Sequence, residues 1–75
     1  MTTLAEKVRA ELAQADPYRA LKVALDAASR AAEEALPGTR GRPAAERFAV
    51  ALRVATETLS RLALEMAGDQ GGGLD

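Results

Sequence analysis

Apolar residues recur at alternating spacings of three and four in two stretches of the chain, on either side of a short central turn. The first stretch consists of Tyr18, Leu21, Leu25, Ala28, Ala32 and Ala35. The second consists of Phe48, Leu52, Ala55, Leu59, Leu62 and Met66. Because this spacing places residues on one side of an α-helix, each stretch predicts an amphipathic helix. A short connection favours antiparallel neighbours, so the two stripes are expected to face each other in a helical hairpin.

Capping residues predict a shorter helix before these two. Thr3 followed by Glu6 is a capping box, which predicts a first helix over about 3–15. Asp16 is a good N-cap for the next helix, and Pro17 suits its first position. The alternative is a single rod that combines the first two helices and is kinked at the proline.

Proline and glycine set the remaining boundaries. The second helix is expected over about 17–36, because Pro37 cannot continue its hydrogen-bond ladder and Gly38 can adopt the left-handed cap. The third helix is expected over about 43–67. The segment 68–75 is rich in glycine and is expected to be a flexible tail.

Length and composition fit one all-α domain, expected over residues 1–67. The chain has 75 residues, of which 48% are hydrophobic and 28% are charged, a balance typical of a folded protein. The formal net charge of -1 gives no overall attraction to nucleic acid or to an anionic membrane. Alanine fills about a quarter of the positions, which favours helices that approach closely but bury little area per residue.

Several classes of protein are disfavoured by what the sequence lacks. No apolar run approaches the roughly 20 residues of a membrane span. The first residues lack the basic start and apolar stretch of a signal peptide. The absence of cysteine excludes disulfides and thiolate zinc sites. We therefore expect a cytoplasmic protein with no membrane partner.

Catalysis has few candidate groups in this chain. It contains neither His nor Cys, the commonest general base and the usual thiol nucleophile. Ser29 and Ser60 fall in mid-helix positions with no base in reach by spacing, and the carboxylates fall off the apolar stripes. No glycine-rich loop has P-loop or Rossmann spacing. We expect no enzyme activity, no catalytic residue, no cofactor and no metal.

The apolar faces are wider than one hairpin needs. The second helix carries an additional set, consisting of Ala20, Val23, Ala24, Ala27 and Ala31, and the third carries Val50 and Val54. Either the first helix covers these residues in a monomeric bundle, or a partner subunit covers them. Because so small a chain buries few large side chains, we expect a homodimer, a four-helix bundle of two hairpins with the first helix outside. The expected interface residues are Leu21, Leu25, Ala28, Phe48, Val50, Leu52, Val54 and Leu59.

Charged residues of alternating sign follow the outer sides of both long helices. They are Lys22, Asp26, Arg30 and Glu34 in the second helix and Arg53, Glu57, Arg61 and Glu65 in the third. Such pairs stabilise an exposed helix. A docking strip is the alternative, but the signs cancel, which favours a solvated face.

A short basic string, Arg40-Gly41-Arg42-Pro43, connects the two long helices. It resembles the core of an AT-hook, a motif that lays an extended Arg-Gly-Arg into the minor groove of A·T-rich DNA. The resemblance implies nucleic-acid contacts by these residues, and Arg47 could join them on one face of a dimer. The favoured alternative is an ordinary turn, with glycine for the bend and Pro43 at the start of the third helix.

Three functions remain open on these observations. We favour a small non-enzymatic protein–protein interaction or regulatory module, which acts as a helical homo-oligomer and docks on a protein partner. The first alternative is a nucleic-acid-binding protein that uses the Arg-Gly-Arg-Pro loop. The second alternative is a structural assembly subunit.

Overall fold

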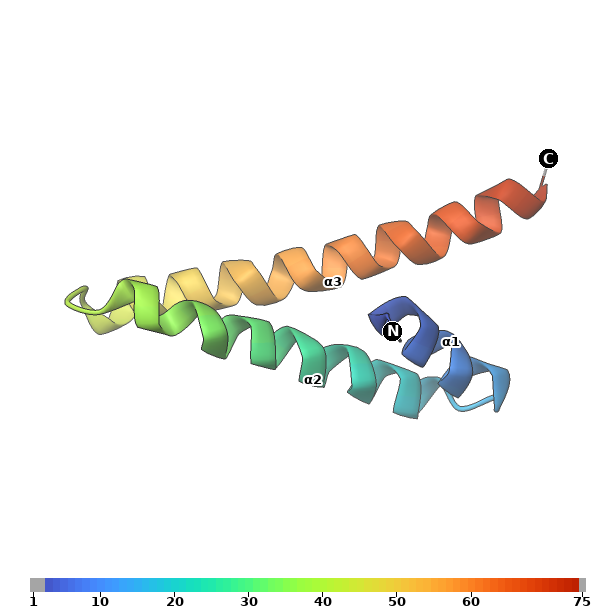
Figure 1. Cartoon of the computed structure of the whole chain (residues 1–75), viewed down its shortest axis with the longest axis horizontal. Coiled ribbons are helices and arrows are strands. Elements are labelled where there is room, and N and C mark those ends of the chain that lie inside the picture. The colour runs from blue at the N-terminus through green and yellow to red at the C-terminus, as the bar shows by residue number, and fades with distance from the viewer. Residues whose placement is uncertain (1–2, 75) are drawn as a thin grey trace.

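The computed structural model describes residues 3–74, with side chains described as far as Gly68. Over this range the chain is all-α, as predicted, with no β-strand. The elements are α1 (Leu4–Ala13), α2 (Pro17–Ala35), the short 3-10 helix η1 (Leu36–Thr39) and α3 (Ala44–Leu74). The long helices α2 and α3 lie side by side near η1 and draw apart toward their other ends. The α1 helix packs at this open end (Figure 1).

The predicted N-caps form at both of the first two helices. Thr3 Oγ1 accepts a hydrogen bond from the amide of Glu6 at 3.2 Å. The Asp16 carboxylate accepts one from the amide of Arg19 at 3.0 Å, and Pro17 is the first residue of α2. Because a non-helical N-cap lies between them, α1 and α2 are separate helices and not one kinked rod.

A left-handed residue, Ala15, turns the chain between these two helices. Its φ is 59°, a region that glycine enters freely and alanine does not. The Ala15 amide donates to the Leu12 carbonyl at 2.9 Å, and the Asp16 amide donates to the Glu11 carbonyl at 3.3 Å. This pair of bonds is the Schellman arrangement, which satisfies the last carbonyls of α1. It folds α1 back onto the two long helices.

The later boundaries differ from the prediction by small amounts. The α2 helix ends at Ala35, and the chain tightens into η1, which contains Pro37 near its start. The α3 helix is bounded by Ala44 and Leu74, beyond the end expected near residue 67. The tail expected over 68–75 falls almost wholly on residues whose side chains lie outside the described part of the chain, so its flexibility stays a prediction.

The core lies where α1 meets the two long helices. Its buried residues are Ala5 and Val8 of α1, Ala20 and Ala24 of α2, and Leu62 of α3. Leu4, Val23, Leu59 and Met66 pack against this cluster and are partly buried. Alanine on α2 lets the neighbouring helices approach closely, so that α1 covers one face of the α2–α3 pair. Of the two ways to cover the alanine set of α2, the structure therefore uses the first helix.

The two apolar stripes turn inward only in part, because each contributes both buried and exposed residues. The α2 helix turns its alanine side inward, with Ala20, Ala24 and Ala28 only 3–5% exposed. Tyr18, Leu21 and Leu25 lie about a quarter turn away from this side and remain at the surface. In α3 the stripe is divided along its length, with Phe48 and Leu52 exposed and Leu62 buried in the core. The reason is geometric, since two helices pack closest where their side chains are smallest.

None of the helices, over the described residues, combines the length and apolar character that crossing a membrane requires.

Candidate interaction surface

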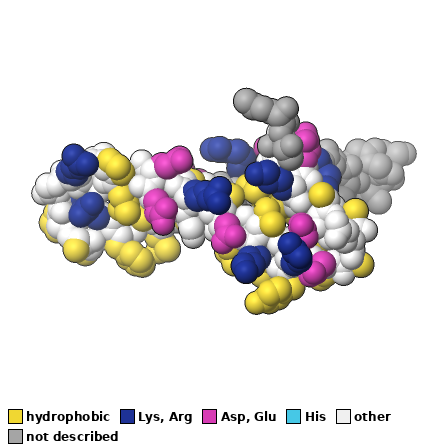
Figure 2. Space-filling view, turned by 60° about the horizontal axis from the view of Figure 1, so that its bottom comes forward, with side chains coloured by type: hydrophobic (Ala, Val, Ile, Leu, Met, Phe, Trp, Pro, Cys, Tyr) yellow, Lys and Arg dark blue, Asp and Glu magenta, His cyan; other side chains and the backbone are white. Residues whose placement is uncertain are grey.

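Five large apolar side chains lie on the face of the α2–α3 pair that α1 leaves uncovered. We call this surface the bare face. It consists of Tyr18, Leu21 and Leu25 of α2 and Phe48 and Leu52 of α3, whose exposed fractions are 78%, 55%, 46%, 67% and 55%. Figure 2 shows hydrophobic side chains at the surface near both ends of the lower edge of the molecule in that view. The positions of Tyr18, Leu21 and Leu25 follow from the helical repeat, which separates them from the alanine side of α2.

The area that the bare face exposes is large for a chain of this size. With aromatic side chains of about 150–250 Å² each and leucines somewhat smaller, the five residues expose on the order of 500 Å². The largest apolar patch on a monomeric protein is about 300–600 Å² and is often functional. The bare face is therefore as large as the largest apolar patches of monomeric proteins.

Two shallow hollows divide the bare face along its length. The first is lined by Tyr18, Leu21, Lys22 and Leu25. The second runs between the end of α2 and the start of α3 and is lined by Ser29, Ala32, Glu33, Leu36, Phe48, Ala51, Leu52 and Ala55. Each hollow has one charged side chain, Lys22 in the first and Glu33 in the second, and the other lining residues are apolar or a serine.

The size of the side chains changes along α2. Tyr18, Leu21 and Leu25 stand out from the first half of the helix, whereas Ser29 and Ala32 occupy the same side of the second half. The bare face of α2 is thus a ridge followed by a groove.

The predicted interface residues fall into two groups in the structure. Leu21, Leu25, Phe48 and Leu52 are exposed on the bare face. In contrast, Ala28 is buried, and Val50, Val54 and Leu59 are half-buried. Their part in an interface stays a prediction. Tyr18 was absent from the predicted set, although its spacing of three from Leu21 places it on the same stripe.

The basic loop at the other end of the molecule has an internal anchor. Arg47 is half-buried, and its Nε donates a hydrogen bond to Thr39 Oγ1 at 3.1 Å. Thr39, only 4% exposed, in turn donates to the Leu36 carbonyl at 2.6 Å. Arg47 therefore fastens η1 to α3.

The rest of the basic loop lies at the surface. Arg40 and Arg42 are exposed on either side of Gly41, whose φ of 87° explains the glycine at the bend. Binding of nucleic acid by these residues stays a prediction.

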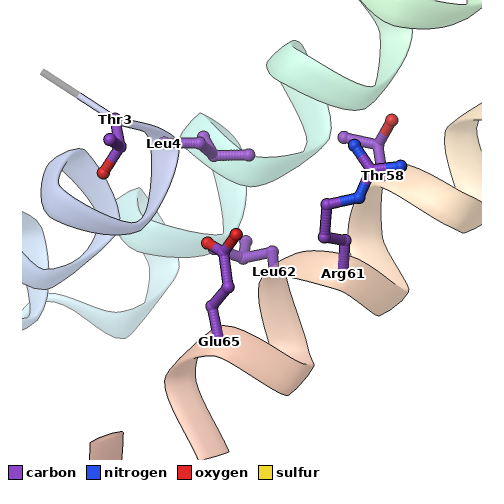
Figure 3. Close-up of a pocket in the computed structure, with 6 residues that line it drawn as sticks. All are labelled: Thr3, Leu4, Thr58, Arg61, Leu62 and Glu65. Carbon is purple, nitrogen blue, oxygen red and sulfur yellow. The ribbon is translucent and has the colours of Figure 1, made fainter. Parts of the chain in front are cut away.

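A further hollow lies between the start of α1 and α3 (Figure 3). Leu4 extends from α1 toward α3, while Arg61 and Glu65 rise from α3 on either side of Leu62. The Thr58 hydroxyl at its edge already donates to the Val54 carbonyl at 3.0 Å. The hollow thus lies along the contact between α1 and α3. Among the described residues, no group of three or more acidic side chains is placed to hold a metal ion.

Comparisons with protein-family models, with curated proteins and with solved structures find no match to this chain.

Proposed function

We propose that this chain is a small protein–protein interaction module that acts as a homodimer, and that the bare face is its self-association surface. The observation that supports the proposal is the exposure of Tyr18, Leu21, Leu25, Phe48 and Leu52 on one face of a small chain. In this dimer, α2 and α3 of each copy form an antiparallel hairpin. The two hairpins make a four-helix bundle, and each α1 lies outside it.

The area of the bare face supports a dimer. A stable interface buries about 800 Å² per partner. The five large side chains expose on the order of 500 Å² of this, and the small residues of the groove supply more when a second copy covers them. Since both copies use the same face, the assembly closes at two chains.

The same face suits a regulatory role. An amphipathic helix of another protein can lie in an apolar groove and is recognised through apolar residues spaced by three and four. A partner helix of this kind competes with the second copy for the groove. The dimer would then release its surface when the partner is abundant, by mass action.

The mass of the particle in solution tests this proposal. We expect sedimentation analysis to give a dimer for the unchanged chain and a monomer of similar helicity for Leu21→Glu, because the change puts a charge at the centre of the ridge. The matched control is Leu64→Glu, since Leu64 is 73% exposed and lies on the charged side of α3. That variant should remain a dimer.

Three results would contradict the proposal. They are a monomeric unchanged chain, a dimer that survives Leu21→Glu, and equal weakening by Leu64→Glu. Assemblies that grow with concentration beyond two chains would instead support a structural assembly subunit.

A further inference from the structure

We infer that the bare face binds the second copy in an antiparallel register, with each α2 lying across the α2 of the other chain. This inference rests on the proposed function, because it requires self-association through the bare face. It adds the orientation of the two copies and the residues that determine it.

The order of large and small side chains along α2 supports this register. The ridge of Tyr18, Leu21 and Leu25 occupies the first half of the helix, and the groove at Ser29 and Ala32 occupies the second half. A two-fold axis that passes between the two α2 helices at the level of Ala27 reverses this order in the second copy. The ridge of each chain then enters the groove of the other, which gives the complementary packing that a stable interface needs.

Individual pairs follow from the reversal. With the axis near Ala27, Leu25 lies against Ser29 of the second copy and Leu21 lies against Ala32 of the second copy. Each leucine thus meets a small residue. Phe48 and Leu52, on the α3 side of the groove, close around the incoming ridge.

Charges at the edge of the bare face support the same register. Lys22 lies beside the ridge and Glu33 beside the groove, and both are exposed. The two residues are three helical turns apart, so they share one edge of α2. An antiparallel pair of helices brings like edges together. Lys22 of each chain therefore approaches Glu33 of the other, which gives two ion pairs per dimer.

The other face-to-face arrangement lacks these ion pairs. If α2 lay over α3 of the second copy, Lys22 would approach the small neutral residues Ser60 and Ala63, which are exposed on α3. The arrangement would still place large residues on small ones, so the charges distinguish the two orientations. Complementary charges of this kind mainly fix register and partner choice.

Charge-reversal variants test the register. Lys22→Glu and Glu33→Lys each replace two attractive contacts per dimer by two repulsive ones. We expect each variant alone to have a dissociation constant about tenfold higher than that of the unchanged chain. In an equimolar mixture, every facing pair is attractive again. The mixture should therefore form heterodimers with an affinity within about threefold of the original.

Matched controls lie on the outer side of α3. Arg53→Glu and Glu57→Lys reverse exposed charges that are outside the bare face. Neither should change the dissociation constant, alone or mixed. Circular dichroism of every variant shows whether α2 and α3 remain helical.

The outcomes separate this inference from the proposed function. Weakened single variants that recover on mixing support the antiparallel register. Single variants that dimerise as the unchanged chain does, or that fail to recover on mixing, overturn the register, while the dimer itself stands if Leu21→Glu abolishes it. A monomeric unchanged chain overturns both.

Discussion

The two faces of the α2–α3 pair are built from different side chains. The face that α1 covers uses Ala20 and Ala24 on α2, which meet Ala5 and Val8 of α1. The bare face carries Tyr18 and Phe48 together with three leucines. The chain thus buries its small residues within one copy and leaves its largest apolar residues at the surface.

This difference shows what each face can contribute. Small residues allow close backbone approach but remove little apolar area from water, so the covered face alone stabilises the chain modestly. Large side chains contribute more when they are buried, at about 1.5–3 kcal/mol each. The bare face therefore holds much of the large apolar surface that a single copy leaves exposed.

Removal of Leu62, a large buried residue of α3, should have the greatest effect on the fold. Leu62 is 8% exposed and belongs to the core cluster with α1 and α2. We expect Leu62→Ala to lower the free energy of unfolding by about 2–4 kcal/mol, because it removes buried methyl groups and leaves a cavity. Chemical denaturation followed by circular dichroism measures this change.

The control for this substitution lies two residues away. Leu64 is 73% exposed, so Leu64→Ala should change stability by less than about 0.5 kcal/mol. Equal losses for the two variants would show that the core is not where α1 meets α3.

A charge at the start of α3 should act on the bare face and not on the core. Leu52 is 55% exposed, so Leu52→Asp removes little packing within one chain. We expect helicity to persist while the dissociation constant of the dimer rises by about 100-fold, as for a central interface residue. Analytical ultracentrifugation combined with circular dichroism separates the two effects. Loss of helicity in dilute, monomeric protein would instead place Leu52 in the core, as the facing stripes predicted.

Local signals in the sequence predicted the local structure. Thr3 and Asp16 cap their helices because each side-chain oxygen accepts a hydrogen bond from the amide three residues later. Such a bond does not depend on any distant part of the chain. The all-α class follows from periodicity over many residues. These features depend on neighbours along the chain, which the sequence displays directly.

The inward side of α2 could not be predicted in this way. Periodicity identifies an apolar stripe but not what covers it, and size favours leucine over alanine for a core position. The structure turns Ala24 inward and Leu21 outward because close packing with α1 and α3 requires small residues. The bond between Arg47 and Thr39 depends in the same way on how η1 folds, which no pattern in the sequence indicates.

The turn at Ala15 determines which face α1 covers. Its left-handed φ of 59° reverses the chain so that Ala5 and Val8 reach α2. Alanine is strained in this conformation and glycine is not, so we expect Ala15→Gly to raise the free energy of unfolding by about 1 kcal/mol. Thermal and chemical denaturation measure the gain. Ala13→Gly is the matched control, since Ala13 is exposed in the last turn of α1 and glycine there should cost about 0.5–1 kcal/mol. A loss of stability in both variants would show that Ala15 does not adopt the left-handed conformation that turns α1 onto α2.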